Sequence, residues 1–202
     1  MIYNKKLVKE PPKSWDVLWD EQYKGKILMF NNPRDAFAIA QTRLGTDFNS
    51  TNEQDWVKAA ELLAEQKDKV NPVYVMDEVF NLMESGEYAL ATYYAGDYVL
   101  MNENNSDLGY CIPEDGVNAF YDAFCIPKCS KNKAGGEAFI NFMQEPEVAL
   151  ANSEFIYYRS ANYTVEQNKE SSLYGNPAVY SNAKNVQYFK NLPQSTNELE
   201  NR

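Results

Sequence analysis

Short apolar runs alternate with longer stretches of helical periodicity along most of the chain. Residues 26–30 and 73–75 are compact apolar runs, which are typical of buried strands. Residues 33–44 and 52–69 carry apolar side chains at helical spacing, with Trp56, Ala59, Ala60 and Leu63 on one face of the second stretch. The pattern therefore predicts strand–helix–helix–strand over the first 75 residues.

The same alternation continues toward the C-terminus. We expect a helix over 76–85, an aromatic strand over 88–94, a helix near 97–103 and a strand over 108–112. An extended segment over 120–127 leads to amphipathic helices over 131–144 and 146–155, and residues 156–202 are mostly polar. Alternating strands and helices predict an α/β layered fold with a largely parallel sheet.

Boundary residues support several of these elements. Ser14 is a good N-cap for a short helix that carries Trp15, Leu18 and Trp19. Pro33 suits the first position of the next helix, and Gly45 suits the position after its end.

Charge and composition narrow the function. The chain has 19 Lys and Arg against 29 Asp and Glu, a formal charge of −10, which argues against nucleic-acid binding and suits a cationic ligand. It has no histidine, so Ser-His and Cys-His nucleophiles are excluded and the commonest metal ligand is missing. No GxGxxG or GxxxxGK[ST] motif is present, so we expect no nucleotide cofactor. Because histidine is missing, we also expect no metal site.

The three cysteines and the opening residues say little about the compartment. Cys111, Cys125 and Cys129 form neither a disulfide framework nor a zinc pattern, and we expect Cys111 and Cys125 to be buried. No signal-peptide core follows Met1, and no stretch reaches the length of a membrane span.

Several segments resemble the polyamine-binding branch of the periplasmic binding proteins. Tyr3-Asn4 and Pro11-Pro12-Lys13-Ser14-Trp15 resemble a "YN…PPxSWxxLW" passage of that family, and Arg34-Asp35-Ala36-Phe37 resembles the next helix. Ile126-Pro127, Lys131-Asn132 and Ala138-Phe139-Ile140-Asn141-Phe142 resemble its "IPxxxKN…A…FINF" helix.

The resemblance implies a type II periplasmic-binding-protein lobe, lacking most of the first lobe. Residues 1–118 would be lobe two, 119–155 a return segment that belongs to lobe one, and 156–202 a segment packing back on lobe two. The function implied is that of a non-enzymatic receptor, periplasmic or anchored outside the cell in its full-length parent. It would hand spermidine or putrescine to the membrane permease subunits of an ABC transporter.

The resemblance also suggests ligand residues, since a polyamine needs carboxylates for its ammonium groups and aromatic faces beside its methylenes. The first acidic pair of the family matches Asn32 and Asp35, with Asn32 replacing the usual Asp. Both residues also suit a helix N-terminus, Asn32 as its cap and Asp35 as the partner in a capping-box-like pair.

Tyr94 stands where the family has an aromatic residue at the end of a strand, a place that opens onto the ligand crevice in α/β sheets. We expect Tyr93 to point to the opposite face, into the core, by strand alternation. Asp97 is a further candidate ligand or a helix cap.

Phe120 and Asp122 match an aromatic residue and an ammonium-binding Asp of the family. Two residues apart in an extended segment, they would share one face, and an Asp in an apolar run is costly unless it is satisfied. The last family contact, a polar amide, has no clear match; Lys190-Asn191 falls near it.

Three other functions stay open. The pairs Tyr93-Tyr94 and Tyr157-Tyr158 would suit a ferric-ion-binding protein of the same fold. Asp35 and Asp122 could serve as acid and base in an enzyme, although no nucleophile or cofactor motif accompanies them. A pure interaction module is the third. The apolar side chains of Phe139, Ile140 and Phe142 further predict self-association through residues 119–155.

Overall fold

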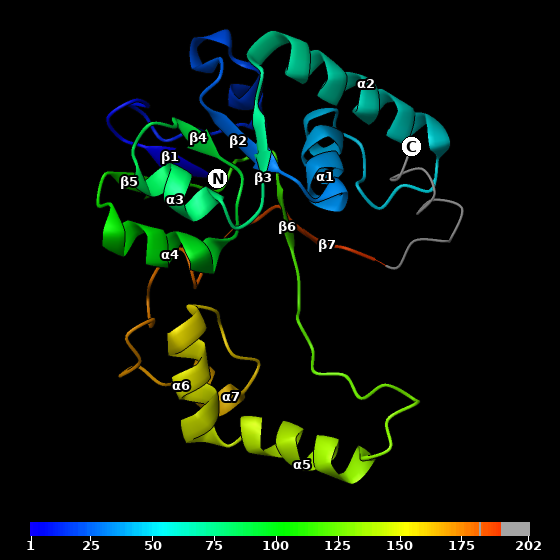
Figure 1. Cartoon of the computed structure of the whole chain (residues 1–202), viewed down its shortest axis with the longest axis vertical. Coiled ribbons are helices and arrows are strands. Elements are labelled where there is room, and N and C mark those ends of the chain that lie inside the picture. Colours follow the sequence, from blue (N-terminus) through cyan, green and yellow to red (C-terminus); the bar gives the residue numbers. More distant parts are fainter. Residues whose placement is uncertain (182, 191–202) are drawn as a thin grey trace. The chain divides into compact units, whose positions relative to one another are not determined.

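The structure, a computed structural model, describes residues 1–181 and 183–190 (Figure 1). Its contacts divide the chain into two units. Of the described residues, the first unit holds 1–120 and 183–190, and the second holds 121–181. The predicted boundaries at residues 118 and 155 stay predictions, as does the place of the segment 156–202. Its residues 156–181 belong to the second unit, whereas backbone pairing of residues 186–188 ties the later part to the first.

The first unit is built on a five-stranded sheet of order β3-β2-β4-β1-β5. Its strands are β1 (Ile2–Asn4), β2 (Ile27–Phe30), β3 (Val73–Val75), β4 (Leu90–Ala91) and β5 (Leu108–Tyr110). β2 runs parallel to both β3 and β4, whereas β1 is antiparallel to β4 and β5. The α/β class is confirmed, but the sheet is mixed, because the opening residues insert as an antiparallel strand.

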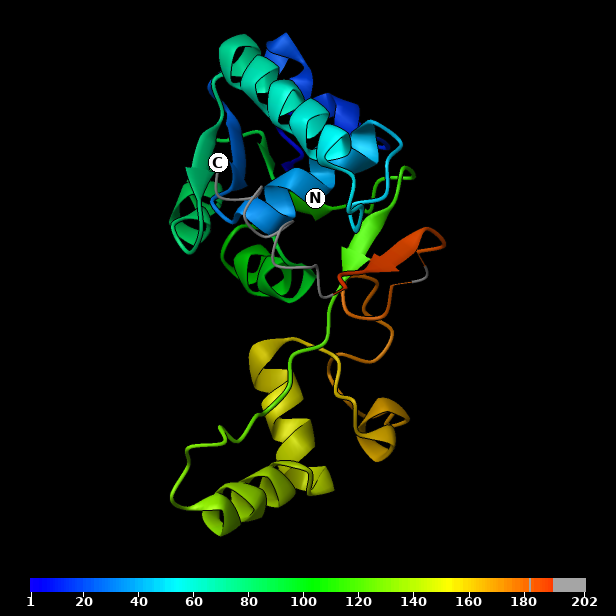
Figure 2. The ribbon, with the colours of Figure 1, turned by 90° about the vertical axis from the view of Figure 1, so that its right-hand side faces the viewer.

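Helices flank this sheet (Figure 2). The short 3-10 helices η1 (Trp15–Trp19) and η2 (Glu21–Tyr23) precede β2. The α-helices of the unit are α1 (Pro33–Arg43), α2 (Glu53–Val70), α3 (Val79–Glu84) and α4 (Ala95–Asn104). α1 packs with α2, and α3 packs with α4.

The predicted boundary residues act as expected. The side chain of Ser14 accepts a hydrogen bond from the backbone of Asp16 at the start of η1. Asn32 caps α1 ahead of Pro33, and Gly45 follows the helix at φ +69°, a conformation that glycine adopts without strain.

The tryptophans of the opening motif belong to the core. Trp15, Leu18 and Trp19 are buried together with all four residues of β2. Trp15 Nε1 donates to the carbonyl of Gly116 at 2.8 Å, and Trp19 Nε1 donates to the carbonyl of Leu62 at 3.1 Å. The motif therefore specifies the fold rather than a ligand contact.

A second, two-stranded sheet pairs β6 (Val117–Ala119) with β7 (Val186–Tyr188) in parallel. Its register places Asn118 opposite Gln187. Both strands belong to the first unit, so this pairing joins the end of its first segment to the returning chain.

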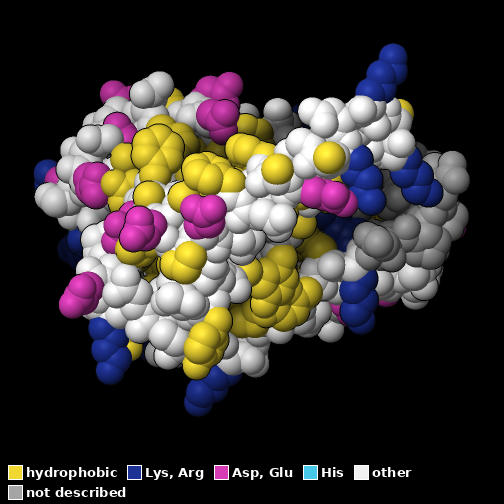
Figure 3. Space-filling view, turned by 90° about the horizontal axis from the view of Figure 1, so that it is seen from below, with side chains coloured by type: hydrophobic (Ala, Val, Ile, Leu, Met, Phe, Trp, Pro, Cys, Tyr) yellow, Lys and Arg dark blue, Asp and Glu magenta, His cyan; other side chains and the backbone are white. Residues whose placement is uncertain are grey.

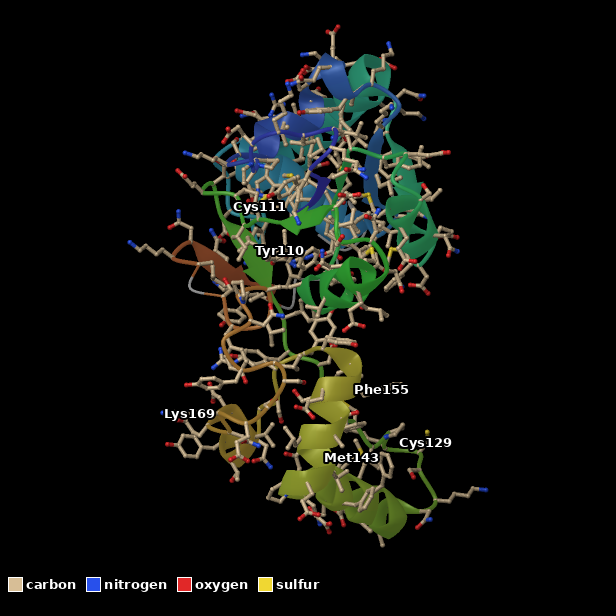
Figure 4. All side chains as sticks on the ribbon, turned by 90° about the vertical axis from the view of Figure 1, so that its left-hand side faces the viewer. Tyr110, Cys111, Cys129, Met143, Phe155 and Lys169 are labelled. Atoms are coloured by element: carbon tan, nitrogen blue, oxygen red, sulfur yellow. The ribbon has the colours of Figure 1, made fainter. Side chains whose placement is uncertain are left out.

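The second unit contains α5 (Lys133–Met143), α6 (Pro146–Ile156) and α7 (Tyr163–Glu166). α5 buries none of its residues, and Phe139 and Phe142 are about half exposed, at 53% and 50%. Exposed hydrophobic side chains gather on the face seen in Figure 3, and Phe155 projects from α6 (Figure 4). The prediction that Cys125 is buried is wrong, because it lies in a stretch of the second unit, residues 121–130, whose side chains are almost all exposed.

Candidate functional site

Three parallel strands end at one edge of the main sheet. β2 leads through Asn32 into α1, β4 leads through Tyr94 into α4, and Asp77 follows β3. Because these strands run in the same direction, their carboxyl ends lie side by side, and ligands of α/β proteins bind at such an edge. The polar and aromatic residues at this edge form the candidate site.

Asp35 is the centre of the site. It lies in the first turn of α1 and is only 5% exposed. The Tyr94 hydroxyl donates to its Oδ2 at 3.0 Å, and Asn118 Nδ2 donates to its Oδ1 at 3.2 Å. Side chains from the start of α1, the start of α4 and β6 thus converge on one carboxylate.

Burial raises the pKa of Asp35 above its ordinary value of 3.8, because removal from water disfavours the charged form. The hydrogen bonds from Tyr94 and Asn118 and the charge of Arg34 act in the opposite direction and lower this pKa. The two neutral donors therefore offset part of the cost of burying the charge.

Asn32 performs the predicted capping role. Its Oδ1 accepts a hydrogen bond from the backbone N–H of Arg34 at 3.1 Å, which satisfies a free donor at the start of α1. Asp35 does not complete the expected capping-box pair, since its two oxygens bond to Tyr94 and Asn118 instead. A ligand role for Asn32 stays a prediction.

An aromatic wall accompanies the carboxylate. The ring of Tyr94 lies 5.0 Å from that of Phe30 and 5.4 Å, edge to face, from that of Phe120. Phe120 is 42% exposed, so this wall reaches solvent. Burial and the charge of Asp35 together raise the pKa of Tyr94 to about 12, and the phenol therefore stays protonated at neutral pH.

The prediction that Tyr93 points away from Tyr94 is wrong. β4 ends at Ala91, so strand alternation does not extend to these two residues, and their rings lie 5.0 Å apart. Tyr93 is buried, as expected, and its hydroxyl donates to Asp77 Oδ1 at 3.0 Å.

Asp97 lies in the first turn of α4, three residues after Tyr94, and is partly exposed. Its charge helps to raise the pKa of both Tyr93 and Tyr94. It adds negative potential beside the aromatic wall, and its contact with a ligand stays a prediction.

Asp122 differs from its expected surroundings. β6 ends at Ala119, so Phe120 and Asp122 do not share a strand face, and Asp122 is exposed rather than enclosed in an apolar run. It belongs to the second unit, whereas Phe120 belongs to the first. Its part in the site stays a prediction. Lys190 is described in the first unit, and Asn191 lies outside the described residues.

The sequence reasoning missed three residues of this edge. Asn118 binds Asp35, Asp77 binds Tyr93, and Phe30 supports the ring of Tyr94. Asp77 and Phe30 could have been found, because each lies at the end of a predicted parallel strand. Asn118 gave a weaker signal, a polar residue between Val117 and Ala119.

The groups at this edge are chemically suited to a cation. A buried carboxylate with two neutral donors and a partly exposed aromatic wall can hold an ammonium group and its alkyl chain. The described residues contain no group of three or more His, Cys, Asp or Glu side chains that could hold a metal ion. No helix among the described residues has both the length and the apolar character needed to span a bilayer.

Comparison with known sequences identifies relatives of this chain. It is 26% identical over 182 residues to the putrescine-binding periplasmic protein PotF of Escherichia coli K12, covering 84% of this chain and 49% of the relative. It is 27% identical over 173 residues to the spermidine/putrescine-binding periplasmic protein of Salmonella typhimurium, covering 86% and 49%. The chain thus spans about half the length of these curated relatives.

A solved structure shares the fold. The substrate-binding protein PotD of a spermidine/putrescine ABC transporter from Streptococcus pneumoniae matches with a TM-score of 0.81 and 27% identity. The match covers 99% of this chain and 62% of that protein. The sequence profile of the bacterial extracellular solute-binding proteins matches residues 1–180. The chain therefore belongs to the bacterial extracellular solute-binding protein family.

Proposed function

We propose that this chain forms part of the substrate-binding component of an ABC importer for polyamines such as spermidine and putrescine. The observation that carries the proposal is the buried carboxylate of Asp35, bonded by Tyr94 and Asn118 beside the exposed ring of Phe120. The names of the relatives agree with this chemistry.

In this function Asp35 holds an ammonium group of the ligand. The faces of Tyr94 and Phe120 flank the adjoining methylenes, where cation–π contacts contribute roughly 0.5–2 kcal/mol each. Asn32, Asp97 and Asp122 are further ligand residues in this proposal. The receptor performs no reaction on the ligand.

The proposal extends to location and partners. The relatives are named as periplasmic proteins, and we place the full-length parent in the periplasm or anchored outside the cell. Ligand binding would close two lobes by a hinge motion, and the closed form would dock on the permease subunits.

Thermal stabilisation tests the proposed function. A ligand that binds the folded state alone raises the melting temperature. Spermidine and putrescine should raise it in a saturable manner, at an ionic strength matched with NaCl. Neutral sugars and amino acids serve as controls. Equal shifts with NaCl alone, or with the controls, would contradict polyamine binding.

The ferric-ion alternative is disfavoured by the same tyrosines that suggested it. Ferric binding requires phenolic oxygens that converge on one ion, whereas the hydroxyl of Tyr93 donates to Asp77 and that of Tyr94 donates to Asp35. We therefore expect no visible phenolate-to-iron absorption when ferric citrate is added to the protein at pH 7. A stoichiometric coloured complex would instead favour an iron-binding function.

We also propose that the chain self-associates through residues 119–155. Phe124, Phe139 and Phe142 each expose half or more of their surface in the second unit. Removing such apolar surface from water stabilises an association by about 25 cal/mol per Å² buried. The partner we propose is a second copy of the chain, which presents the same face.

Light scattering checks this prediction. The average mass should rise with concentration, and replacing Phe139 and Phe142 by Ser should keep the protein monomeric. Tyr74→Ser, at a side chain that is 37% exposed in the first unit, is the matched control and should still associate. A wild-type protein that remains monomeric at millimolar concentration would count against the prediction.

A further inference from the structure

Asn118 is a polar residue in the middle of β6 whose side chain reaches a distant part of the chain. Its Nδ2 donates to Asp35 Oδ1 at 3.2 Å, across 83 positions of the sequence. Its backbone pairs in register with Gln187 of β7, so β6 is held in the fold independently of this contact.

Each oxygen of the Asp35 carboxylate accepts a hydrogen bond from a different side chain. Tyr94 occupies Oδ2 and Asn118 occupies Oδ1, one neutral donor on each oxygen. A carboxylate oxygen can accept two hydrogen bonds, so each oxygen retains one acceptor position. Two donors on separate oxygens fix the rotation of the carboxylate and thereby the direction of its remaining lone pairs.

The charged groups nearest to Asp35 lie on α1 and α4. The nearest cation on its own helix, Arg34, lies over the rings of Trp56 and Phe189, at 5.7 Å and 4.6 Å from their centroids. The charge of Arg34 is the smallest of the named influences on the pKa of Asp35. From α4 the facing groups are the neutral phenol of Tyr94 and, beyond it, the carboxylate of Asp97.

We infer that Asn118 is a positioning residue, which fixes the orientation of Asp35 and favours its charged form, so that the carboxylate can receive an ammonium group. The ligand half of this inference rests on the proposed function. Asn118 need not touch the polyamine, because its effect is transmitted through Asp35.

A purely structural role is the competing explanation. In that case the hydrogen bond would simply tether β6 to α1, and its loss would lower stability without changing the titration of Asp35. The experiment must therefore measure the titration of the Asp35 carboxyl group as well as the affinity for a ligand.

The test compares wild type with Asn118→Leu, which removes the donor at nearly constant size. The side-chain carboxyl carbon of Asp35 is followed by NMR as the pH is varied without ligand. The titration midpoint should move to higher pH in Asn118→Leu, because one of the interactions that favours the charged form is lost. Spermidine affinity at pH 7 should fall about tenfold, the value of one hydrogen bond to a charged group.

Gln187→Leu is the matched control. Gln187 is the exposed cross-strand partner of Asn118, so its replacement perturbs the same small sheet without removing a donor from Asp35. Asn118→Gln retains an amide donor and should recover part of the wild-type midpoint.

The outcomes separate the two claims. A shifted midpoint in Asn118→Leu but not in Gln187→Leu supports the positioning of Asp35 by Asn118. An unchanged midpoint, or the same shift in both variants, overturns it, as does a shifted midpoint with unaltered spermidine affinity. If wild type binds no spermidine while the midpoint still depends on Asn118, the proposed function fails and the positioning of Asp35 stands.

Discussion

Replacing Asp35 by Asn is expected to weaken spermidine binding by about 30-fold or more, because loss of a buried charge partner costs roughly 2–5 kcal/mol. Asn keeps the size of the side chain and can still accept the hydrogen bond from Tyr94, so the site should remain folded. Isothermal titration calorimetry with spermidine and putrescine measures the loss.

The same variant should change stability in a pH-dependent way. Because the folded-state pKa of Asp35 lies above its ordinary value of 3.8, its stabilising contribution is fully present below that pH and is lost as pH rises through the folded-state pKa. Ionisation of Asp35 therefore destabilises the fold as the pH rises through its folded-state pKa. The free energy of unfolding of Asp35→Asn, relative to wild type, should be higher at pH 7 than at pH 4.

Asp68→Asn supplies the control for both measurements. Asp68 is exposed on α2, so this variant changes the net charge by the same amount without touching the site. It should leave affinity and the pH dependence of urea unfolding close to those of wild type. Equal spermidine affinity in wild type and Asp35→Asn would remove Asp35 from the ligand site.

Trp15→Ala should lower the free energy of unfolding by about 3–5 kcal/mol, the usual cost of deleting a buried aromatic side chain. Trp15 is 6% exposed, and its ring nitrogen and backbone nitrogen donate to Gly116 and Asp115, at 2.8 Å and 2.7 Å. These bonds hold the chain just before β6, the strand that presents Asn118.

Urea unfolding followed by circular dichroism measures the effect. Trp15→Phe keeps an aromatic ring and loses the Nε1 donor, so it should cost less, about 1–3 kcal/mol. A loss below about 1 kcal/mol for Trp15→Ala would show that the opening motif is not part of the core that supports the site.

Local signals explain why much of the fold could be predicted. β2 and β3 are apolar runs bounded by Gly and Pro, and they are observed as Ile27–Phe30 and Val73–Val75. The two limits of α1 depend on local features. Asn32 caps its start with a side-chain acceptor, and Gly45 follows its end with a left-handed backbone. The family resemblance was confirmed by the profile match over residues 1–180.

Long-range pairing explains what could not be predicted. The aromatic segment 88–94 has the pattern of one strand, but only Leu90–Ala91 pair in the sheet, and the ring centroids of Tyr93 and Tyr94 lie 5.0 Å apart. Asn118 meets Asp35 only because β6 crosses the start of α1, a contact that no local pattern encodes.

The ligand role of Asp122 stays a prediction, although its surroundings differ from those expected. The resemblance matched it to an ammonium-binding Asp, and its apolar neighbours suggested that it needed a partner. In the structure those neighbours are themselves exposed, and Asp122 belongs to the second unit. Asp35 and Tyr94, by contrast, are joined by a hydrogen bond within the first unit.

The most direct test of a cation site at Asp35 is an NMR titration of the wild-type chain with spermidine at pH 7 and constant ionic strength. The carboxyl signal of Asp35 and the ring signals of Phe120 should shift together along one saturable curve, while the signal of Asp68 stays fixed. If the Asp35 signal does not move at spermidine concentrations that saturate any other response, the ammonium group binds elsewhere and the account is wrong.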